Sequence, residues 1–360
     1  MITTTMLRCI LSVVFSLSFW ALPPLSEAFV GSYQNGLRPQ TTRSRLHQQG
    51  SVESAENDAN ETVDAPVTPP LSIIPIPMLE SSQFRHPLDQ RLTSLVRSAP
   101  FYGLAEETLR RGFPLIEQGV RLDLMSSSVK VSPQQLPDLH HLLVEACGVL
   151  NFPSTFVPEL YVQSNPQANA YTLAIQSRQT AKNKGKDKNS YSSSVIVVTS
   201  ALVDRCTPRE LQAVLGHELG HLKCEHALYL TLGNLASSPL SRLPVVGGRV
   251  DSLLQDWRLA AEYSCDRAAL LVAQDSDVVA SSLMKLFAGT SRYELNTKAF
   301  VEQSLEYEKQ LETANPLVRM SIQQQQRTHP LPVKRVAELE KWFRSDDYQR
   351  IVSPAGNSAK

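Results

Sequence analysis

Apolar residues recur every three or four positions along most of the chain beyond residue 80, which is the spacing of one face of an α-helix. Polar residues fill the positions between them. The pattern predicts that the carboxyl-terminal half of the chain is almost entirely helical. The predicted helices span residues 89–120, 132–150, 208–230, 253–274, 277–288, 297–313 and 332–343.

Short runs rich in Val, Ile, Tyr and Thr interrupt the helical spacing, and such runs are typical of strands. Residues 180–194 are rich in Lys, Asn, Gly and Ser, which predicts a long solvated loop before the last strand. Helices and strands together predict an α+β fold that is predominantly helical and has one small sheet. The predicted strands span residues 129–131, 159–162, 170–175 and 195–199.

The amino-terminal residues read as two targeting segments in series. Residues 1–28 resemble a signal peptide, with an apolar run of roughly 14 residues and small residues before a cleavage site after Ala28. Residues 29–50 contain no acidic residue and carry Arg among Ser and Thr, as transit peptides do. The Ala28–Phe29 junction resembles that of the bipartite plastid leaders of diatoms and related algae. We therefore expect delivery to a plastid, with the secretory pathway as the alternative.

The folded domain is expected to span residues 81–345. Residues 51–80 are acidic and Pro-rich, which predicts a disordered linker, and residues 346–360 are predicted to be a disordered tail. No stretch from residue 80 onward reaches 18 consecutive apolar residues, so no transmembrane helix is expected there. The stripe that contains Arg110 and Arg111 suits either a membrane-surface face or packing on the core.

The overall charge gives no reason to expect a nucleic-acid partner. Lys and Arg together number 35, as do Asp and Glu, so the chain has no net field that would attract a polyanion. The five cysteines form no CxxC pair, which argues against a disulfide-stapled domain. Cys224 and Cys265 flank the strongest candidate site, and we interpret them as core residues rather than metal ligands.

The strongest chemical signal is His217-Glu218-Leu219-Gly220-His221, on the predicted helix 208–230. Thr207 suits the N-cap, Pro208 the first helical position, and Glu210 completes a capping box. The four-residue spacing places both imidazoles on one face, where they can hold a single Zn²⁺. Glu218, beside the first imidazole, can reach the attacking water as a general base.

A catalytic zinc needs a third protein ligand and an open fourth position. Glu262 and Asp266 share one face of the predicted helix 253–274, among Ala and Leu residues. Glu262 is the natural third ligand, and Asp266 can accept a hydrogen bond from a ligating imidazole and fix its tautomer. His140 and His141 are adjacent and point about 100° apart, so they cannot both serve one site.

These residues resemble the HtpX-like and CAAX-prenyl-protease-related zinc peptidases, which are gluzincins. Asn169-Ala170-Tyr171-Thr172 resembles the edge strand of that family, and Thr328-His329-Pro330 with Arg335 resembles its carboxyl-terminal motif. The resemblance covers roughly residues 83–345. Residues 84–89 and 261–271 look most similar to its soluble plastid branch, known from plastoglobules.

The resemblance implies a gluzincin-like fold in which an edge strand lies beside the HExxH helix and a second helix supplies a metal ligand. It implies one Zn²⁺ per chain. His329 is expected either to hydrogen-bond the developing oxyanion or to be a structural histidine in a turn. The implied roles are metal ligands His217, His221 and Glu262, catalytic Glu218 and His329, supporting Asp266, and substrate-binding Asn169, Ala170 and Tyr171.

The expected function is a zinc metalloendopeptidase that acts on extended or unfolded protein segments, in quality control or turnover in a plastid. Its partners are protein or peptide substrates, and peripheral contact with a membrane or plastoglobule surface is a further expectation. Two alternatives stay open at this stage. One is a non-catalytic scaffold or lipid-droplet protein with the same fold, and the other is a zinc hydrolase with a non-peptide substrate.

Overall fold

The computed structural model describes residues 76–100, 102–173, 194–241, 247–289, 295–325 and 331–353. These ranges belong to one of two compact units of the chain, and the other unit, Leu22–Ser72, falls outside them. The predicted targeting segments, most of the predicted linker, almost all of the insert 180–194 and the motif that contains His329 also fall outside the described residues.

The sheet is small and mixed, with strand order β1-β2-β4-β3. It consists of β1 (Ser128–Lys130), β2 (Glu159–Gln163), β3 (Ala170–Leu173) and β4 (Val195–Thr199). β4 pairs in parallel with β2 and antiparallel with β3. All five residues of β4 are buried, as expected for a central strand covered on both faces. Within the described residues, β3 has a strand partner on one side only, so it is an edge strand.

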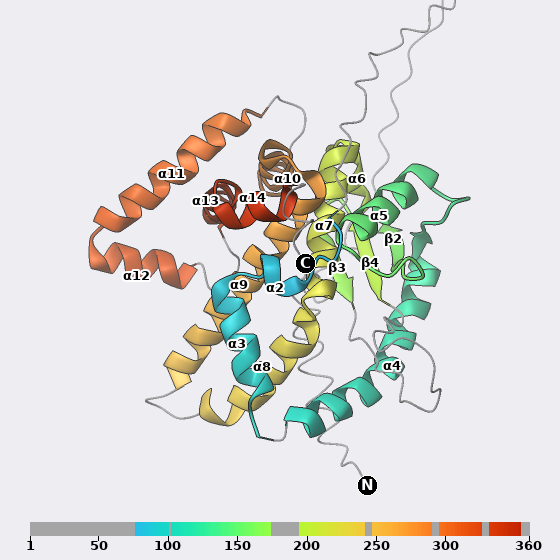
Figure 1. The fold of residues 1–360 in the computed structure, drawn as a ribbon, viewed down its shortest axis with the longest axis horizontal. Coiled ribbons are helices and arrows are strands. Elements are labelled where there is room, and N and C mark those ends of the chain that lie inside the picture. Colours follow the sequence, from blue (N-terminus) through green and yellow to red (C-terminus); the bar gives the residue numbers. More distant parts are fainter. Residues whose placement is uncertain are drawn as a thin grey trace, which may run out of the picture. The chain divides into compact units, whose positions relative to one another are not determined.

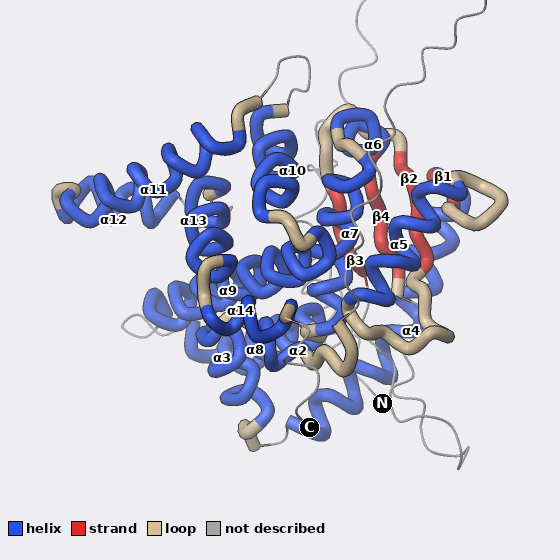
Figure 2. The backbone as a smooth tube through the Cα atoms, turned by 45° about the horizontal axis from the view of Figure 1, so that its top comes forward, coloured by secondary structure: helices blue, strands red, loops and turns tan. Residues whose placement is uncertain are grey.

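Helices cover both faces of this sheet (Figure 2). Ile196 and Val198 pack into the main core, which also contains residues of α5 (Pro137–Val149) and α7 (Pro208–Lys223). Val195 and Val197 point the other way and pack with Leu124 of α4 (Tyr102–Ser127). Alternating β4 residues therefore contact opposite layers, and α7 is fixed against the sheet.

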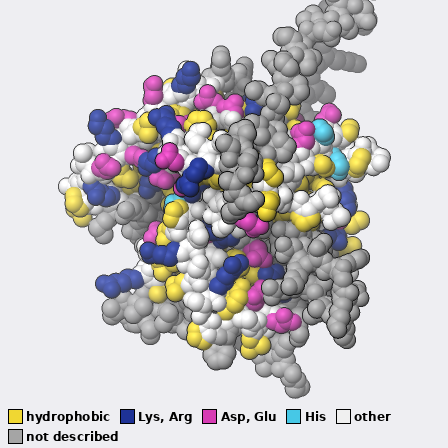
Figure 3. Space-filling view, viewed as in Figure 1, with side chains coloured by type: hydrophobic (Ala, Val, Ile, Leu, Met, Phe, Trp, Pro, Cys, Tyr) yellow, Lys and Arg dark blue, Asp and Glu magenta, His cyan; other side chains and the backbone are white. Residues whose placement is uncertain are grey.

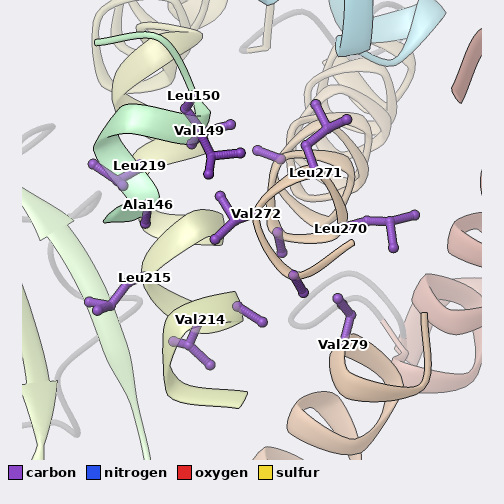
Figure 4. Close-up of a cluster of buried hydrophobic side chains, with 14 of the residues drawn as sticks. Ala146, Val149, Leu150, Val214, Leu215, Leu219, Leu270, Leu271, Val272 and Val279 are labelled. Carbon is purple, nitrogen blue, oxygen red and sulfur yellow. The ribbon is translucent and has the colours of Figure 1, made fainter. Parts of the chain in front are cut away.

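The pairing of α7 with α9 (Gly247–Ala273) forms the centre of the fold, and Figure 1 shows α7 between the sheet and α9. Two glycines on α7 make the close approach possible. A Cβ atom added at Gly216 would lie 2.9 Å from Val272, and one added at Gly220 would lie 2.9 Å from Ala268. Around this contact, side chains of α5, α7, α9 and α10 (Ser276–Ala288) interlock (Figure 4).

The predicted start of α7 is confirmed, but its predicted extent was wrong. Thr207 accepts from the backbone N–H of Glu210, and the Glu210 carboxylate accepts from the N–H of Thr207, which completes the capping box. The predicted helix 208–230 is broken, however, because Glu225 adopts a left-handed conformation with φ of 51°. A second helix, α8 (His226–Ser241), starts immediately afterwards and takes a new direction.

Other boundaries also differ from the predictions. The predicted helix 89–120 is two helices, α3 (Pro87–Arg97) and α4, which are separated by a turn. The expected linker ends before Ile76, since Ile76 and Leu79 are buried in the core. The sequence pattern did not predict α2 (Ser81–Phe84), α6 (Ser200–Arg205) or α12 (Pro316–Gln325).

The prediction of a disordered tail from residue 346 was wrong for its first residues. They form α14 (Asp346–Val352), whose N-cap Ser345 accepts from the N–H of Tyr348. The Tyr348 ring is buried against Trp342 of α13 (Pro332–Phe343), with ring centroids 5.2 Å apart. Burial of this aromatic side chain explains why the short segment is helical.

The remaining helix, α11 (Thr297–Thr313), packs beside α13 and carries many charged side chains. Lys341 of α13, for example, contacts Glu308 of α11 at 3.0 Å. Figure 3 shows Lys, Arg, Asp and Glu side chains interspersed over this region. Within the described ranges, every helix is too short or too polar to span a bilayer.

Candidate active site

The structure brings the three predicted metal ligands together where α7 faces α9. The Nε2 atom of His217 lies 3.4 Å from one carboxylate oxygen of Glu262, and the Nε2 atom of His221 lies 3.6 Å from the other. Two ligand atoms on a tetrahedral zinc are about 3.4 Å apart, because each metal–ligand bond is about 2.0–2.1 Å long. Two imidazoles and one carboxylate at this spacing fit a zinc ion.

The site is also open enough for chemistry. The side chains of His221 and Glu262 keep 24% and 26% of their surface exposed, so a water molecule and a substrate can reach them. A structural zinc site is normally closed by four protein ligands, whereas a catalytic one leaves a position free. The donor set and its exposure therefore resemble those of a catalytic site.

Asp266 lies where the sequence analysis placed it, one helical turn beyond Glu262. Its Oδ1 atom is 3.0 Å from Nδ1 of His217, and Arg335 of α13 donates to both of its oxygens at 2.6 and 2.8 Å. Burial alone would raise the pKa of Asp266, but Arg335 and His217 lower it below its ordinary value. An ionised Asp266 accepts from Nδ1 of His217 and leaves Nε2 free to bind a metal.

The charge around His217 links metal binding to pH. Burial would lower the pKa of His217, but Asp266 and Glu262 raise it to about 9. His221 differs, since burial lowers its pKa to about 3. A metal binds the unprotonated imidazole, so binding at His217 must displace a proton, and metal affinity falls as the pH falls.

The carboxylate of Glu218 contacts the edge strand. Its Oε2 atom accepts a hydrogen bond from Thr172 of β3 at 2.7 Å, and only 5% of the residue is exposed. Burial raises the pKa of Glu218 above the ordinary carboxyl value. A carboxylate that is held in place and made more basic is suited to accept a proton from water.

The predicted substrate-binding residues lie on or beside β3. Asn169 precedes the strand, and its backbone N–H and C=O pair with the side chain and backbone of Thr199. Ala170 and Tyr171 belong to the strand itself and pair in register with Val198 and Val197. The structure therefore places an edge strand directly beside Glu218, as the sequence analysis expected.

Cys265 lies close to the same histidines. A ring nitrogen of His217, one of His221 and Sγ of Cys265 lie within 4.8 Å of one another. However, Cys265 is fully buried, which raises the pKa of its thiol, and its sulfur lies 3.5 Å from Nδ1 of His226. Glu262 faces the Nε2 atoms of both histidines, and His217 and Arg335 lower the pKa of its carboxyl group, so its chemistry suits a metal ligand better than the buried thiol does.

Sequence reasoning missed two residues behind the site. The Nδ1 atom of His221 lies 3.1 Å from Nδ1 of His226, and Nε2 of His226 lies 3.0 Å from Asp89 on α3. Burial would lower the pKa of His226, but Asp89 raises it to about 9 before any metal binds. His226 is five residues after His221, which is not the spacing of one helix face, so the pattern gave no signal for it.

Two other predicted contributors have different outcomes. His329 falls outside the described residues, so its predicted role stays a prediction. Arg335, which the sequence analysis grouped with it, lies at the site, where one of its nitrogens is 3.6 Å from Glu262. His141, which the sequence analysis did not assign to the site, is exposed on α5 and pairs with Glu145.

The comparisons with known proteins agree with this geometry. Residues 133–343 match the model of peptidase family M48. The chain is 40% identical over 287 residues to the plastoglobule-localized metallopeptidase 48, chloroplastic, of Arabidopsis thaliana. This match covers 78% of this chain and 78% of that protein. It is 26% identical over 240 residues to the protease HtpX homolog 2 of Methanosarcina mazei, covering 59% of this chain and 74% of that protein.

A third relative, the protease HtpX homolog of Moorella thermoacetica, is 33% identical over 122 residues, which is 34% of this chain and 35% of that protein. No solved structure matches the chain. The family match covers more than half of the chain and includes every residue of the ligand cluster. The chain therefore belongs to peptidase family M48, and it is a metallopeptidase.

Proposed function

We propose that the chain is a zinc-dependent endopeptidase that cleaves extended or unfolded protein segments in a plastid. The observation that carries this proposal is the convergence of Nε2 of His217, Nε2 of His221 and the Glu262 carboxylate at zinc spacing, beside Glu218 and an edge strand. Zinc held there supplies Lewis acidity, which activates a water molecule and polarises the scissile carbonyl.

Glu218 is the proposed proton carrier. Its carboxylate accepts the proton of the attacking water and passes it to the leaving amine, because one buried group can reach both positions in turn. The hydrogen bond from Thr172 fixes the carboxylate in the same place throughout. Asp266 and Arg335 hold His217 in the orientation that ligation requires.

The proposed substrate site is the edge of β3 that faces away from β4, where the described residues include no further strand. The backbone N–H of Thr199 donates to the carbonyl of Asn169, so by antiparallel alternation the backbone groups of Ala170 and Thr172 point to the other side, away from β4. An extended peptide can add to these groups by main-chain pairing. Main-chain pairing depends little on sequence, which favours unfolded segments as substrates.

The first experiment compares the purified wild type with Glu218→Gln on an unfolded protein such as casein. The variant should bind zinc as the wild type does and lose at least roughly 100-fold in kcat, which is the size of a general-base contribution. His217→Ala should lose zinc, whereas the matched control His141→Ala, on the exposed face of α5, should keep both zinc and activity. Full activity of Glu218→Gln would refute the mechanism.

The second experiment tests the edge strand with Ala170→Pro. Proline removes an N–H that faces away from β4, and edge strands tolerate proline at such positions. KM for unfolded substrate should rise while zinc binding stays unchanged. Unaltered KM in a folded variant would mean that substrate binds elsewhere.

The plastid location is proposed from the leader and from the name of the chloroplast relative. Residues 1–50 fused to a fluorescent protein should direct it to plastids, and Phe29→Ala should divert it. Fluorescence in the secretory pathway for both fusions would favour the alternative location.

A further inference from the structure

The two histidine ligands have different partners behind them. Nδ1 of His217 contacts a carboxylate, Asp266, which is held by Arg335. Nδ1 of His221 contacts another imidazole, His226, at 3.1 Å, and the two rings meet edge to face with centroids 5.1 Å apart. An imidazole can donate or accept, so this contact fixes the tautomer of His221 only if something fixes that of His226.

Asp89 does so. It is completely buried, and its Oδ2 atom lies 3.0 Å from Nε2 of His226. Trp257 and Ser264 donate to the same carboxylate at 3.0 and 2.8 Å, and Arg85 lies 3.5 Å from it. A carboxylate surrounded by donors is ionised and can only accept, so Nε2 of His226 must donate.

The hydrogen bonds then follow in one order. When Nε2 of His221 binds a metal, Nδ1 of His221 carries the proton of that ring and donates to Nδ1 of His226. With the metal bound, His226 is therefore the neutral tautomer, which accepts at Nδ1 and donates through Nε2 to Asp89, whereas in the metal-free protein its raised pKa keeps both ring nitrogens protonated. Cys265, whose sulfur lies 3.5 Å from Nδ1 of His226, is consistent with an acceptor at that atom.

We propose that Asp89 and His226 are positioning residues that fix the ring orientation and tautomer of His221. This inference rests on the proposed zinc site. Asp89 lies on α3, upstream of residues 133–343 that match the family model, so the amino-terminal helices become part of the active site. The left-handed conformation at Glu225 makes the contact possible, because it turns His226 back toward His221.

A second metal site is the competing interpretation. One ligand atom each from Asp89, Cys224 and His226 lie within 4.8 Å of one another. The contacts favour positioning, because both oxygens of Asp89 already accept hydrogen bonds and Nδ1 of His226 faces His221. A metal would have to displace these partners.

The test measures the zinc affinity of the purified full chain by competition with a chelator. His226→Leu should weaken zinc binding about 10- to 100-fold, the usual effect of removing such a partner of a metal ligand. His226→Asn should recover most of the loss, since its side-chain oxygen can accept from Nδ1 of His221. The matched control His141→Leu should bind zinc as the wild type does.

Two further readouts separate positioning from a structural role. In cobalt-substituted protein, the visible absorption spectrum should change in His226→Leu and return toward that of the wild type in His226→Asn. Asp89→Asn retains the shape of the side chain and serves as the second test if His226→Leu does not fold. It should also weaken zinc binding about 10- to 100-fold. Circular dichroism of the metal-free proteins verifies folding.

The outcomes are distinct. Wild-type zinc affinity in folded His226→Leu and Asp89→Asn would overturn the inference, even if Glu218→Gln is inactive and the proposed function stands. A second zinc ion per wild-type chain that Cys224→Ala removes would replace positioning by metal binding. If His217→Ala keeps its zinc, the proposed function itself fails.

Discussion

At the scale of single residues, the candidate metal site depends on two glycines, Gly216 and Gly220, because they have no side chain. Gly216 and Gly220 lie on the face of α7 that meets α9, and a Cβ atom at Gly220 would lie 3.0 Å from the Cα atom of Cys265. Backbone cannot yield as a flexible side chain does. The close approach of α7 and α9, and with it the short distance from His221 to Glu262, therefore depends partly on the absence of a Cβ atom at Gly216 and at Gly220.

Gly220→Ala should destabilise the protein by about 1–3 kcal/mol, the usual cost of adding a methyl group to a packed core. It should also weaken zinc binding, because the added methyl group pushes α9 away from α7 and so moves Glu262 away from His217 and His221. Urea unfolding and chelator competition measure the two effects. The matched control is Gly148→Ala on α5, where a Cβ atom meets nothing within 4 Å, and it should be neutral or stabilise by up to about 1 kcal/mol. Equal behaviour of both variants would contradict this explanation.

Residue spacing predicts contacts within one helix well and contacts between distant segments poorly. His217 with His221, and Glu262 with Asp266, were found because each pair shares a helix face. Asp89 and His226 are 137 positions apart and meet only after folding. No periodicity relates them, and their buried network could be found only from the structure.

At the scale of secondary-structure elements, the first turn of α7 is connected to α10. Glu210 completes the capping box and also contacts Lys285 of α10 at 2.6 Å. Burial would raise the pKa of Glu210, but Lys285, Ser281 and the Thr207 backbone lower it below 4.5. One carboxylate therefore stabilises a helix start and a contact between helices.

This ion pair predicts a pH dependence of stability. Because the folded-state pKa of Glu210 is lowered, its contribution is complete above about pH 4.5 and is lost as the pH falls through the folded-state pKa. Glu210→Gln retains the capping geometry and should cost about 1 kcal/mol at pH 7, with a smaller difference at pH 3. Urea unfolding at both values measures it, with exposed Glu302→Gln as the control. A difference that does not shrink in acid would count against the ion pair.

The elements that sequence could not predict share a physical reason. The left-handed turn that ends α7 lies at Cys224-Glu225-His226, which contains neither Gly nor Pro. The local sequence therefore did not predict this turn. The fold imposes it, since His226 then contacts both Asp89 and His221. The start of α7 was predictable because its capping box is local.

At the scale of the whole molecule, the candidate site joins parts of the chain that are far apart. α3, β3, α7, α9 and α13 each contribute a side chain. The sequence analysis expected the contributions of β3, α7 and α9 and singled out Arg335 of α13, but it did not predict the contribution of α3. A metal that binds His217, His221 and Glu262 therefore stabilises the contact between two central helices.

Removal of zinc should lower the thermal midpoint. A ligand that binds only the folded state at about 1,000 times its Kd adds about 4 kcal/mol to the free energy of unfolding, and a chelator abolishes that gain. Calorimetry with and without chelator measures it. His217→Ala should melt at the same temperature in both conditions, and a wild type that is equally insensitive would contradict the zinc site.

The placement of Arg335 on α13 has a consequence for the order in which the candidate site assembles. Arg335 donates to Asp266, 69 positions earlier in the chain, and Asp266 contacts Nδ1 of His217. The candidate site is therefore complete only once α13 has packed against α9, so a folding intermediate without α13 does not hold Asp266 in place.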